Sequence, residues 1–462
     1  MDNERWEQIL NYDLDSPMSD YGFSTRLANE NFWTKNFTQQ AIVEYKKFMY
    51  LASTSDMMVS PSEVIDIVWH QHLIFTSGYH QFCELLGKQI QHVPSTHTKE
   101  EFGKFKQAKE RTKKLYADTF GEQPRGIWHY TGMYESLGLE KAKLNIRTFV
   151  LIGLLFFVLL YFPVYYVLQP FYLEINGSDF ILPYVAIILF VVIGLSALNR
   201  LYLSHMIKNT DPSSFLFHLH PMELVYLKTG KLNDVINITL NQLILRKKIK
   251  LTSHSLVQTE GSQPDNLEEF NALDLLKQNG KVNYRVLLKW LSISSIFGTT
   301  ANCMDALRKY ITKSKKFGIL FYINFGVLGT LFMVGFVRLV MGLLRDKPVD
   351  FIAAVLIVLA VIVVVRLTSL TRITGRKIIP DFYKEDLLPA RKESKHPQWQ
   401  YFLFGAAVLT PVFVSVVNYV ERDDSRGTGG SSGGSSSDSS GGSSCGSSCG
   451  SSCSSCGGCG GD

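Results

Sequence analysis

The chain has 462 residues, of which 46% are apolar, and it carries a formal net charge of +6. This length allows two or three domains of ordinary size. The modest positive charge does not by itself indicate a nucleic-acid partner, and the average apolar share hides a strong segregation of hydrophobic and polar stretches along the chain.

The first 146 residues are predicted to form a helical globular domain. They begin with the polar and acidic stretch MDNERWEQILNYDLDS, which indicates no secretory signal, so this region is expected in the cytoplasm. The stretch SPSE at residues 60–63 is typical of a helix start. Ser60 can cap the helix, Pro61 suits its first position, and Glu63 can act as the capping-box acid.

Acidic and histidine side chains follow on that predicted helix. Asp66 and His70 are four residues apart and share a face, whereas His72 lies about 200° from His70. Together with His92 they are a candidate site for zinc or iron. The spacing matches no known zinc motif such as H-E-x-x-H. Two other interpretations therefore stay open: a buried polar anchor in which Asp66 orients an imidazole, and acid-base catalysis.

Several segments of this region resemble one family in the same order: RLANENFW, EYKKFMYLA, PSEVIDIVWHQHLIFTSGYHQFC, GKQIQHVPS and FGEQPRGIW. They are similar to the bacterial branch of the glycine-rich domain-containing protein-like family, over about residues 20–130. The resemblance implies a shared fold unit and no established reaction. The positions that match the family pattern are Asp66, Trp69, His70, His72, Tyr79, Cys83, His92, Gly121 and Trp128. Structural roles are expected for Ser60, Glu63, Trp69, Tyr79, Cys83 and Trp128.

Five stretches are candidate membrane spans, because a spanning helix needs about 20 apolar residues. Two lie within residues 149–198, two within 317–370 and a fifth within 402–420. The fourth reaches spanning length only if Arg366 snorkels to the interface. The fifth is shorter and contains Pro411, which membrane helices tolerate.

Lysine and arginine residues set the expected orientation, because they concentrate in cytoplasmic loops. Residues 199–316 and 371–400 are rich in both and are predicted to be cytoplasmic, the second range as a basic loop, whereas 169–179 contains neither. Five spans then place the N-terminal domain inside and the residues after 420 outside. Without the fifth span, the C-terminal tail stays in the cytoplasm.

Residues 199–316 are predicted to form a basic, winged-helix-like domain. Pro221 can open a short helix that Gly230 ends, a second helix follows, and alternation at Lys250–Thr252 indicates a strand. No recognition helix rich in Arg, Asn or Gln follows. We therefore expect the basic surface to face lipid headgroups and expect no nucleic-acid partner.

The whole arrangement resembles a family of bacterial membrane proteins with an HPxE-type domain between spans and a Gly/Cys-rich terminus. The signature is HPME at residues 220–223. The resemblance implies that many members join this domain to the first domain seen here. The present tail departs from the usual form, because Ser replaces much of the Gly and the cysteines number only five.

Residues 421–462 are predicted to be a disordered Ser/Gly/Cys tail. Five of the seven cysteines of the chain lie in it, at Cys445, Cys449, Cys453, Cys456 and Cys459. Exposed cysteines oxidise and cross-link, so their regular spacing argues against a tail without a role. Three roles stay open: capture of Zn or Cu by Cys453, Cys456 and Cys459, disulfide exchange with a partner, and modification by a separate enzyme, as the likeness to modified peptides implies.

Together these features predict a mainly α, multi-span bacterial inner-membrane protein with two cytoplasmic helical domains and a disordered tail. Its expected role is to anchor and present the tail, without enzymatic activity of its own. The expected partners are the membrane and a Cys-modifying enzyme or another membrane or envelope protein. A metal-dependent enzyme in the N-terminal domain is the main alternative. A transporter is disfavoured, because the spans hold few charges deep inside them.

Overall fold

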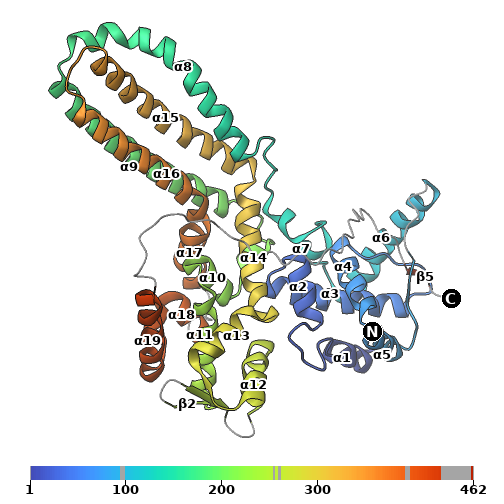
Figure 1. The fold of residues 1–462 in the computed structure, drawn as a ribbon. Coiled ribbons are helices and arrows are strands. Elements are labelled where there is room, and N and C mark those ends of the chain that lie inside the picture. Colours follow the sequence, from blue (N-terminus) through green and yellow to red (C-terminus); the bar gives the residue numbers. More distant parts are fainter. Residues whose placement is uncertain are drawn as a thin grey trace.

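The structure is a computed structural model of the chain that describes residues 2–93, 99–252, 255–258, 262–390, 396–427 and 459–460. Over these residues the protein is mainly α-helical and has three regions (Figure 1): an N-terminal domain, an arm of long apolar helices, and a middle domain at the base of the arm. The prediction of a mainly α protein with several membrane-length helices is confirmed.

The N-terminal domain packs its helices around buried aromatic side chains. Tyr45, Phe48, Trp69 and Phe82 have no exposed surface, and burying a large side chain of this kind contributes roughly 2–3 kcal/mol. Helix α3 lies along α4 in this core. The elements are α1 (Asn3–Asn11), α2 (Phe23–Asn31), α3 (Lys35–Thr54), α4 (Glu63–Ile74), α5 (Thr76–Leu86), β1 (Gln91–His92), α6 (Lys99–Phe120), α7 (Arg125–Trp128) and η1 (Met133–Leu137). Strand β1 pairs antiparallel with β5 (Cys459–Gly460).

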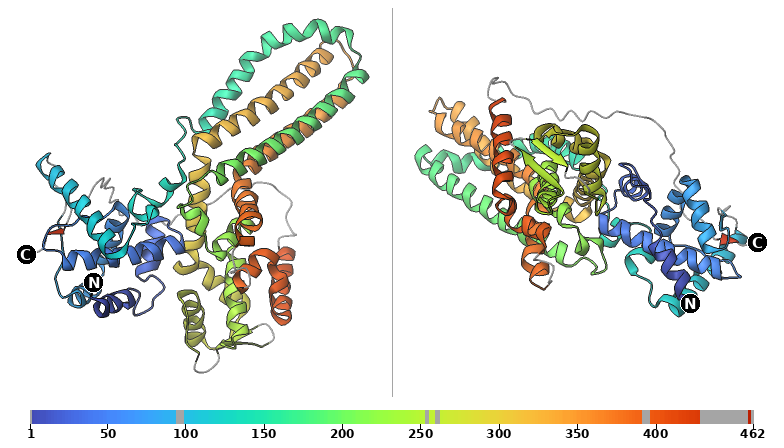
Figure 2. Two further views of the ribbon diagram at one scale, coloured as in Figure 1. Left: turned by 180° about the vertical axis from the view of Figure 1, so that it is seen from behind. Right: turned by 90° about the horizontal axis from the view of Figure 1, so that it is seen from below.

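The arm extends away from the two domains, as Figures 1 and 2 show. Its helices are α8 (Ile146–Glu174), α9 (Gly177–Lys208), α15 (Lys315–Leu343) and α16 (Asp350–Ile373). Apolar side chains such as Leu155, Phe190 and Phe351 are 62%, 78% and 78% exposed. Such exposure to water is unfavourable, and each helix is longer than the roughly 20 residues that cross a bilayer. The four helices are therefore candidate membrane spans.

Polar side chains join the arm helices at two levels. Asn199 of α9 and Asn324 of α15 are buried and exchange amide hydrogen bonds of 2.9 and 2.7 Å. Near the α8–α9 turn, Arg338 donates to the carbonyl oxygens of Tyr172 and Ile175 at 2.6 and 2.7 Å. Interhelical amide pairs hold membrane helices together, and the arginine lies near the end of its helix, where it can reach headgroups.

The middle domain combines a helical cluster with a small sheet. Pro221 is the first residue of α10, and the helix ends at Gly230, whose φ of +71° favours glycine, as predicted. Strands β2, β3 and β4 form an antiparallel sheet in that order. The elements are η2 (Phe215–His218), α10 (Pro221–Thr229), α11 (Leu232–Leu245), β2 (Ile249–Thr252), β3 (Ser255–Gln258), α12 (Leu267–Asn279), β4 (Val282–Asn283), α13 (Tyr284–Ile293) and α14 (Ser295–Thr312).

The chain after α16 continues in helical form through residues 374–390, so the prediction of a basic loop is wrong there. Tyr383 is fully buried, and its hydroxyl donates to the carbonyl oxygen of Leu216 at 2.8 Å and accepts from the backbone N–H of Leu219 at 2.7 Å. The apolar residues between the basic ones thus pack on the middle domain. The elements are η3 (Thr374–Ile378), α17 (Ile379–Phe382), η4 (Tyr383–Leu387) and η5 (Leu388–Ala390).

The last apolar segment is bent into two short helices. These are α18 (Pro397–Phe404) and α19 (Pro411–Gly427), separated by the turn η7 (Gly405–Val408). The apolar parts of the two helices meet at 67°, so the protein has four candidate spans, or five if this pair counts as one. In Figure 1 the pair lies beside the middle domain, at the opposite end from the tip of the arm.

Candidate metal centre

Helix α4 carries the residues of the candidate site, and it begins two residues later than predicted. Ser62 is the cap, because its hydroxyl accepts from the backbone N–H of Ile65 at 3.3 Å. Ser60 lies in the extended chain before the helix, so it does not cap. Glu63 is the first helical residue, and its carboxylate faces Lys109 at 3.7 Å instead of forming a capping box.

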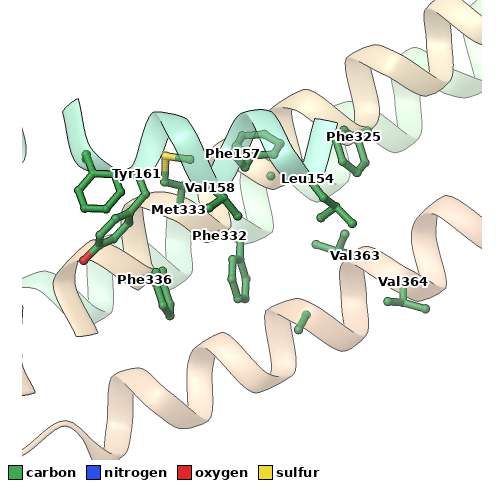
Figure 3. A pocket seen from close by; sticks show the side chains of 13 residues that line it. Leu154, Phe157, Val158, Tyr161, Phe325, Phe332, Met333, Phe336, Val363 and Val364 are labelled. Carbon is green, nitrogen blue, oxygen red and sulfur yellow. The ribbon is translucent and has the colours of Figure 1, made fainter. Parts of the chain in front are cut away.

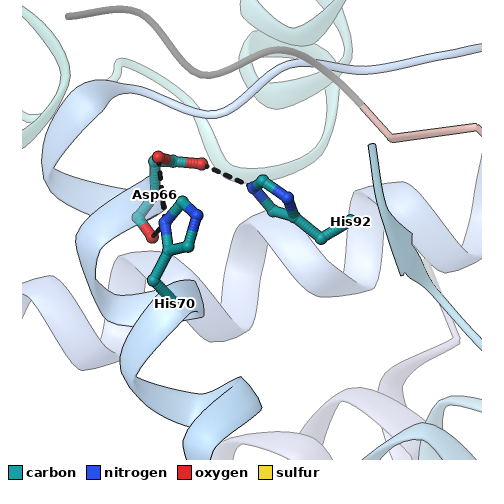
Figure 4. Close-up of side chains that lie close together, drawn as sticks. All are labelled: Asp66, His70 and His92. Carbon is teal, nitrogen blue, oxygen red and sulfur yellow. Dashed lines mark hydrogen bonds and ion pairs between the residues drawn. The ribbon is translucent and has the colours of Figure 1, made fainter. Parts of the chain in front are cut away.

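Asp66, His70 and His92 form a compact group (Figure 4). One carboxylate oxygen of Asp66 lies 3.0 Å from Nε2 of His92, and the other lies 3.1 Å from Nδ1 of His70. Ligand atoms of the three residues all fall within 4.8 Å of one another. Two tetrahedral ligands of a zinc ion at about 2.1 Å are about 3.4 Å apart, so the histidine rings would have to move closer together to bind one ion.

The surroundings give this group one closed side and one open side. Asp66 and His92 have side chains that are 11% and 8% exposed, whereas the side chain of His70 is 47% exposed. The ring of Trp69 packs edge-on against His92, with centroids 4.4 Å apart. The hydrogen bond that His70 donates to Asp66 raises the pKa of His70 above its ordinary value, against the opposing effect of partial burial. Protein would cover a bound ion on the side of Asp66 and His92, and solvent would reach the ion on the side of His70.

His72 does not join these three residues. It is buried on the other side of α4, where its Nδ1 lies 2.8 Å from the hydroxyl of Tyr45. Burial lowers the pKa of His72 to about 4, so the ring is neutral at physiological pH. The separation follows from the helical period, since residues two apart point in nearly opposite directions. The structure therefore divides the four predicted ligands into a group of three and a buried histidine of the core.

The structural residues hold His92 in place. The indole N–H of Trp69 donates to the hydroxyl of Tyr79 at 3.1 Å, and that hydroxyl in turn donates to the carbonyl oxygen of Ile90. Ile90 precedes β1, so this chain of hydrogen bonds fixes the segment that carries His92. Cys83 is a buried free thiol of the same core.

Sequence reasoning missed a buried carboxylate elsewhere in the N-terminal domain. Glu44 of α3 is 4% exposed and accepts hydrogen bonds from Tyr116 and Trp128, both at 2.7 Å. Lys47 pairs with its other oxygen at 2.8 Å. Trp128, for which a structural role was expected, is one member of this network. No local spacing could reveal the network, because its members come from three separated segments.

The HPME signature lies at the contact between the two domains. Glu223 accepts from the backbone N–H of His220 at 2.7 Å, which closes a capping box on α10. Its other oxygen accepts from the backbone N–H of Lys35 at 2.8 Å, at the start of α3. Burial raises the pKa of Glu223 to about 7 and lowers that of His220 to about 3. The side chain of Lys35 pairs with Glu268 of α12 beside a cavity of about 420 Å³. The motif therefore joins α10 to the N-terminal domain.

A larger cavity of about 550 Å³ lies among α8, α15 and α16 in the arm (Figure 3). Its walls are apolar side chains such as Phe157, Phe332 and Val363. No Asp, Glu, Lys, Arg or His is among its lining residues. An ion pathway usually needs such groups, and the lining of this cavity offers none.

The predicted thiol residues of the tail fall largely beyond the described parts of the chain. Cys445, Cys449, Cys453 and Cys456 lie outside those residues, and Cys459 is described only through the backbone of β5.

Gly121, which matches the predicted family pattern, has a φ of +87° at the end of α6. This is a left-handed conformation that glycine adopts without strain.

Comparison with known proteins identifies one part of the molecule. Residues 18–118 match the UCP032817-like family, whose description states no activity. No curated protein and no solved structure matches the chain. The matched range includes Asp66, His70 and His92, so the candidate metal centre lies inside the domain that the match covers. Residues 18–118 are a UCP032817-like domain, attached to four or five candidate membrane-spanning helices.

Proposed function

We propose that the protein binds a divalent transition metal in its N-terminal domain and holds that site at the membrane. The observation that supports the proposal most directly is the convergence of Asp66, His70 and His92, with ligand atoms within 4.8 Å of one another. Two imidazoles and one carboxylate are a ligand set that suits zinc or non-haem iron, and copper also accepts imidazole.

The residues would hold the metal in a simple way. The Asp66 carboxylate and one ring nitrogen each of His70 and His92 would hold the ion, in place of the contacts that now join the carboxylate to the two rings. A ligand set of three leaves coordination positions for water or a substrate, and the exposed side of His70 gives access to them. Bound zinc or iron supplies Lewis-acid chemistry at those positions. Trp69 and the Tyr79 hydroxyl keep His92 oriented when the ligands close on the ion.

Metal analysis of the purified full-length protein tests this proposal. We expect about one zinc or iron ion per chain, and we expect Asp66→Asn, His70→Ala and His92→Ala each to lower the content at least tenfold, as the loss of one ligand of three does. His80→Ala is the matched control, because His80 is an exposed histidine on the neighbouring helix α5. Retention of the metal in all three ligand variants would overturn the proposal, and so would its loss in His80→Ala.

We also propose that the membrane-bound body presents the cysteine-rich tail, whose thiols are modified by a separate enzyme. The support is the concentration of five of the seven cysteines in the last 18 residues. Mass spectrometry of the tail from native cells tests this role. A mass shift on Cys445, Cys449, Cys453, Cys456 or Cys459, beyond the loss of two hydrogens per disulfide, is expected. Unmodified thiols would favour metal capture or disulfide exchange instead.

We also propose that the middle domain has a winged-helix-like fold. It is supported by the order of two helices, α10 and α11, followed by the antiparallel hairpin β2–β3. A DNA-reading helix must expose a face to the major groove. In α11 every residue from Val235 to Leu243 is buried, which favours a role as a structural support beside the membrane over nucleic-acid binding.

A further inference from the structure

The last apolar segment is hydrogen-bonded to the middle domain in α18 and again just before α19. In α18, the carbonyl oxygen of Phe402 accepts from Nζ of Lys228 on α10 at 2.9 Å. Between α18 and α19, the backbone N–H of Thr410 donates to the side-chain oxygen of Asn241 on α11 at 2.9 Å. A break in a helix frees backbone groups that lipid cannot satisfy. Here Asn241 satisfies one of them.

Helix α19 buries one stripe of its surface against the same domain. Phe413, Val416, Val417 and Val420 follow the spacing of one helical face and are 0%, 3%, 6% and 8% exposed. The ring of Phe413 packs edge-on against Tyr284 at the start of α13, with centroids 5.5 Å apart. A helix that buries a stripe on a protein surface is the ordinary pattern of a globular domain.

The lengths of the two helices also fit a docked hairpin. Helix α18 has eight residues, which span about 12 Å. The apolar part of α19 ends at Val420, and the same helix continues through the charged sequence ERDDSR. The ten residues from Pro411 to Val420 span about 15 Å, which is half of the roughly 30 Å hydrocarbon core of a bilayer. The 67° bend shortens their combined reach further.

The surface on which the segment docks belongs outside the bilayer. The middle domain contains a charged cluster in which Glu269, fully buried, pairs with Arg246 and Lys248 at 2.8 and 2.7 Å. Such a network next to lipid chains would be costly. Figures 1 and 2 show α18 and α19 beside this domain and apart from the outer part of the arm. The segment cannot pack on α11 and α13 and cross the membrane at the same time.

We propose that residues 397–420 close the middle domain and do not cross the membrane, so the chain has four spans and its C-terminal cysteines face the same compartment as the N-terminal domain. An even number of spans returns the chain to the side from which it started. The lysine and arginine residues of 199–316 mark that side as the cytoplasm. This replaces the outward-facing tail predicted from the sequence.

The proposal changes the chemistry available to the tail. In the cytoplasm, thiols stay largely reduced, so stable disulfide exchange with an outside partner is disfavoured. Metal capture and modification by a cytoplasmic enzyme remain possible roles for Cys445 to Cys459. The tail thiols and the Asp66–His70–His92 group would then share one compartment, so both could handle the same cytoplasmic metal ions.

Reporter fusions at the C-terminus of the full-length protein test the number of spans. A fluorescent protein that matures only in the cytoplasm is expected to be bright there, and alkaline phosphatase, which is active only after export, is expected to be inactive. The same reporters inserted at Asn176, in the exposed α8–α9 turn, should give the opposite result. An active phosphatase at the C-terminus together with a dark fluorescent fusion would overturn the proposal.

Thiol labelling of intact cells gives a second readout on the unfused protein. Asn176→Cys should react with a membrane-impermeant maleimide in intact cells, and His80→Cys only after lysis. Each of these marker cysteines is introduced into a chain whose five tail cysteines are changed to Ser. The native cysteines Cys83 and Cys303 are buried and add little background. The tail cysteines are expected to behave like His80→Cys. Labelling of the tail in intact cells would refute the four-span arrangement, whatever the outcome of the metal analysis.

Discussion

Two apolar segments that look alike in sequence, α16 and the pair α18–α19, have opposite surroundings. Val361 in the middle of α16 is 58% exposed, whereas Phe413 in α19 is fully buried against the middle domain. Both segments are apolar enough to suggest a span, and only the second meets a protein surface that covers it. The length of an apolar segment therefore indicates a membrane span only when no other part of the chain packs against that segment.

The largest expected effect comes from removing the ring at the centre of the docked segment. Phe413→Ala leaves a cavity between α19 and α13 and should lower the free energy of unfolding by about 3–5 kcal/mol. Phe404→Ala is the matched control, because Phe404 ends α18 and is 63% exposed. We expect little change for it. Denaturant unfolding of both variants in detergent measures the difference.

Equal effects of the two Phe→Ala substitutions would contradict the docked arrangement, because two lipid-facing rings should respond alike. Retained membrane localisation of Phe413→Ala would show that the arm inserts without the docked segment. Loss of the whole protein from the membrane in Phe413→Ala alone would indicate instead that residues 397–420 take part in insertion.

A charge placed on each apolar segment sharpens the comparison further. Val361→Lys puts a cation near the centre of α16 and should cost about 2.5–3.5 kcal/mol of insertion free energy. Val412→Lys puts the same cation on the outer face of α19, where the side chain is 66% exposed, and should cost almost nothing in water. Quantification of the protein in washed membranes separates the two cases. An equal loss for Val412→Lys would mean that α19 faces lipid.

Local patterns predicted those parts of the molecule that depend on neighbouring residues. The start and end of α10 followed from Pro221 and Gly230. The placement of Asp66 and His70 on one face followed from their spacing of four. The same reasoning placed His72 on another face, although it was kept among the candidate ligands. Helical periodicity is a local property, so one sequence is enough to reveal it.

The parts that were missed depend on contacts between distant segments. His92 was predicted as a ligand, but the hydrogen bonds of Trp69 and Tyr79 that fix the chain before β1 were not. Glu223 caps its own helix, which its spacing could suggest, but its bond to Lys35 joins residues 188 positions apart. The docking of α19 on α13 is of the same kind. Apolar residues alone cannot show whether lipid or protein will cover them.

The smallest expected effect concerns pH and comes from charged groups that are buried in the middle domain. Burial raises the pKa of Glu223 from 4.5 to about 7. The stability that its protonated form contributes is complete below about pH 4.5 and is lost as the pH rises through about 7. His220, with a pKa lowered from 6.5 to about 3, is neutral in the folded chain above pH 6.5, whereas in the unfolded chain it still loses its proton between pH 6.5 and 8.

Between pH 6.5 and 8 Glu223 therefore lowers the stability, while His220 raises it by a smaller amount that wild type and Glu223→Gln share. Glu268, whose pKa is lowered mainly by Lys35 against the effect of burial, is ionised throughout that range. We expect the wild-type protein to lose about 1 kcal/mol more than Glu223→Gln over this interval. Thermal unfolding at several pH values measures the two slopes, with the exposed Glu84→Gln as control. Parallel slopes for wild type and Glu223→Gln would show that the carboxylate is already ionised at pH 6.5. The contact between α10 and α3 would then be a charged bond, and its strength would not change across the physiological range.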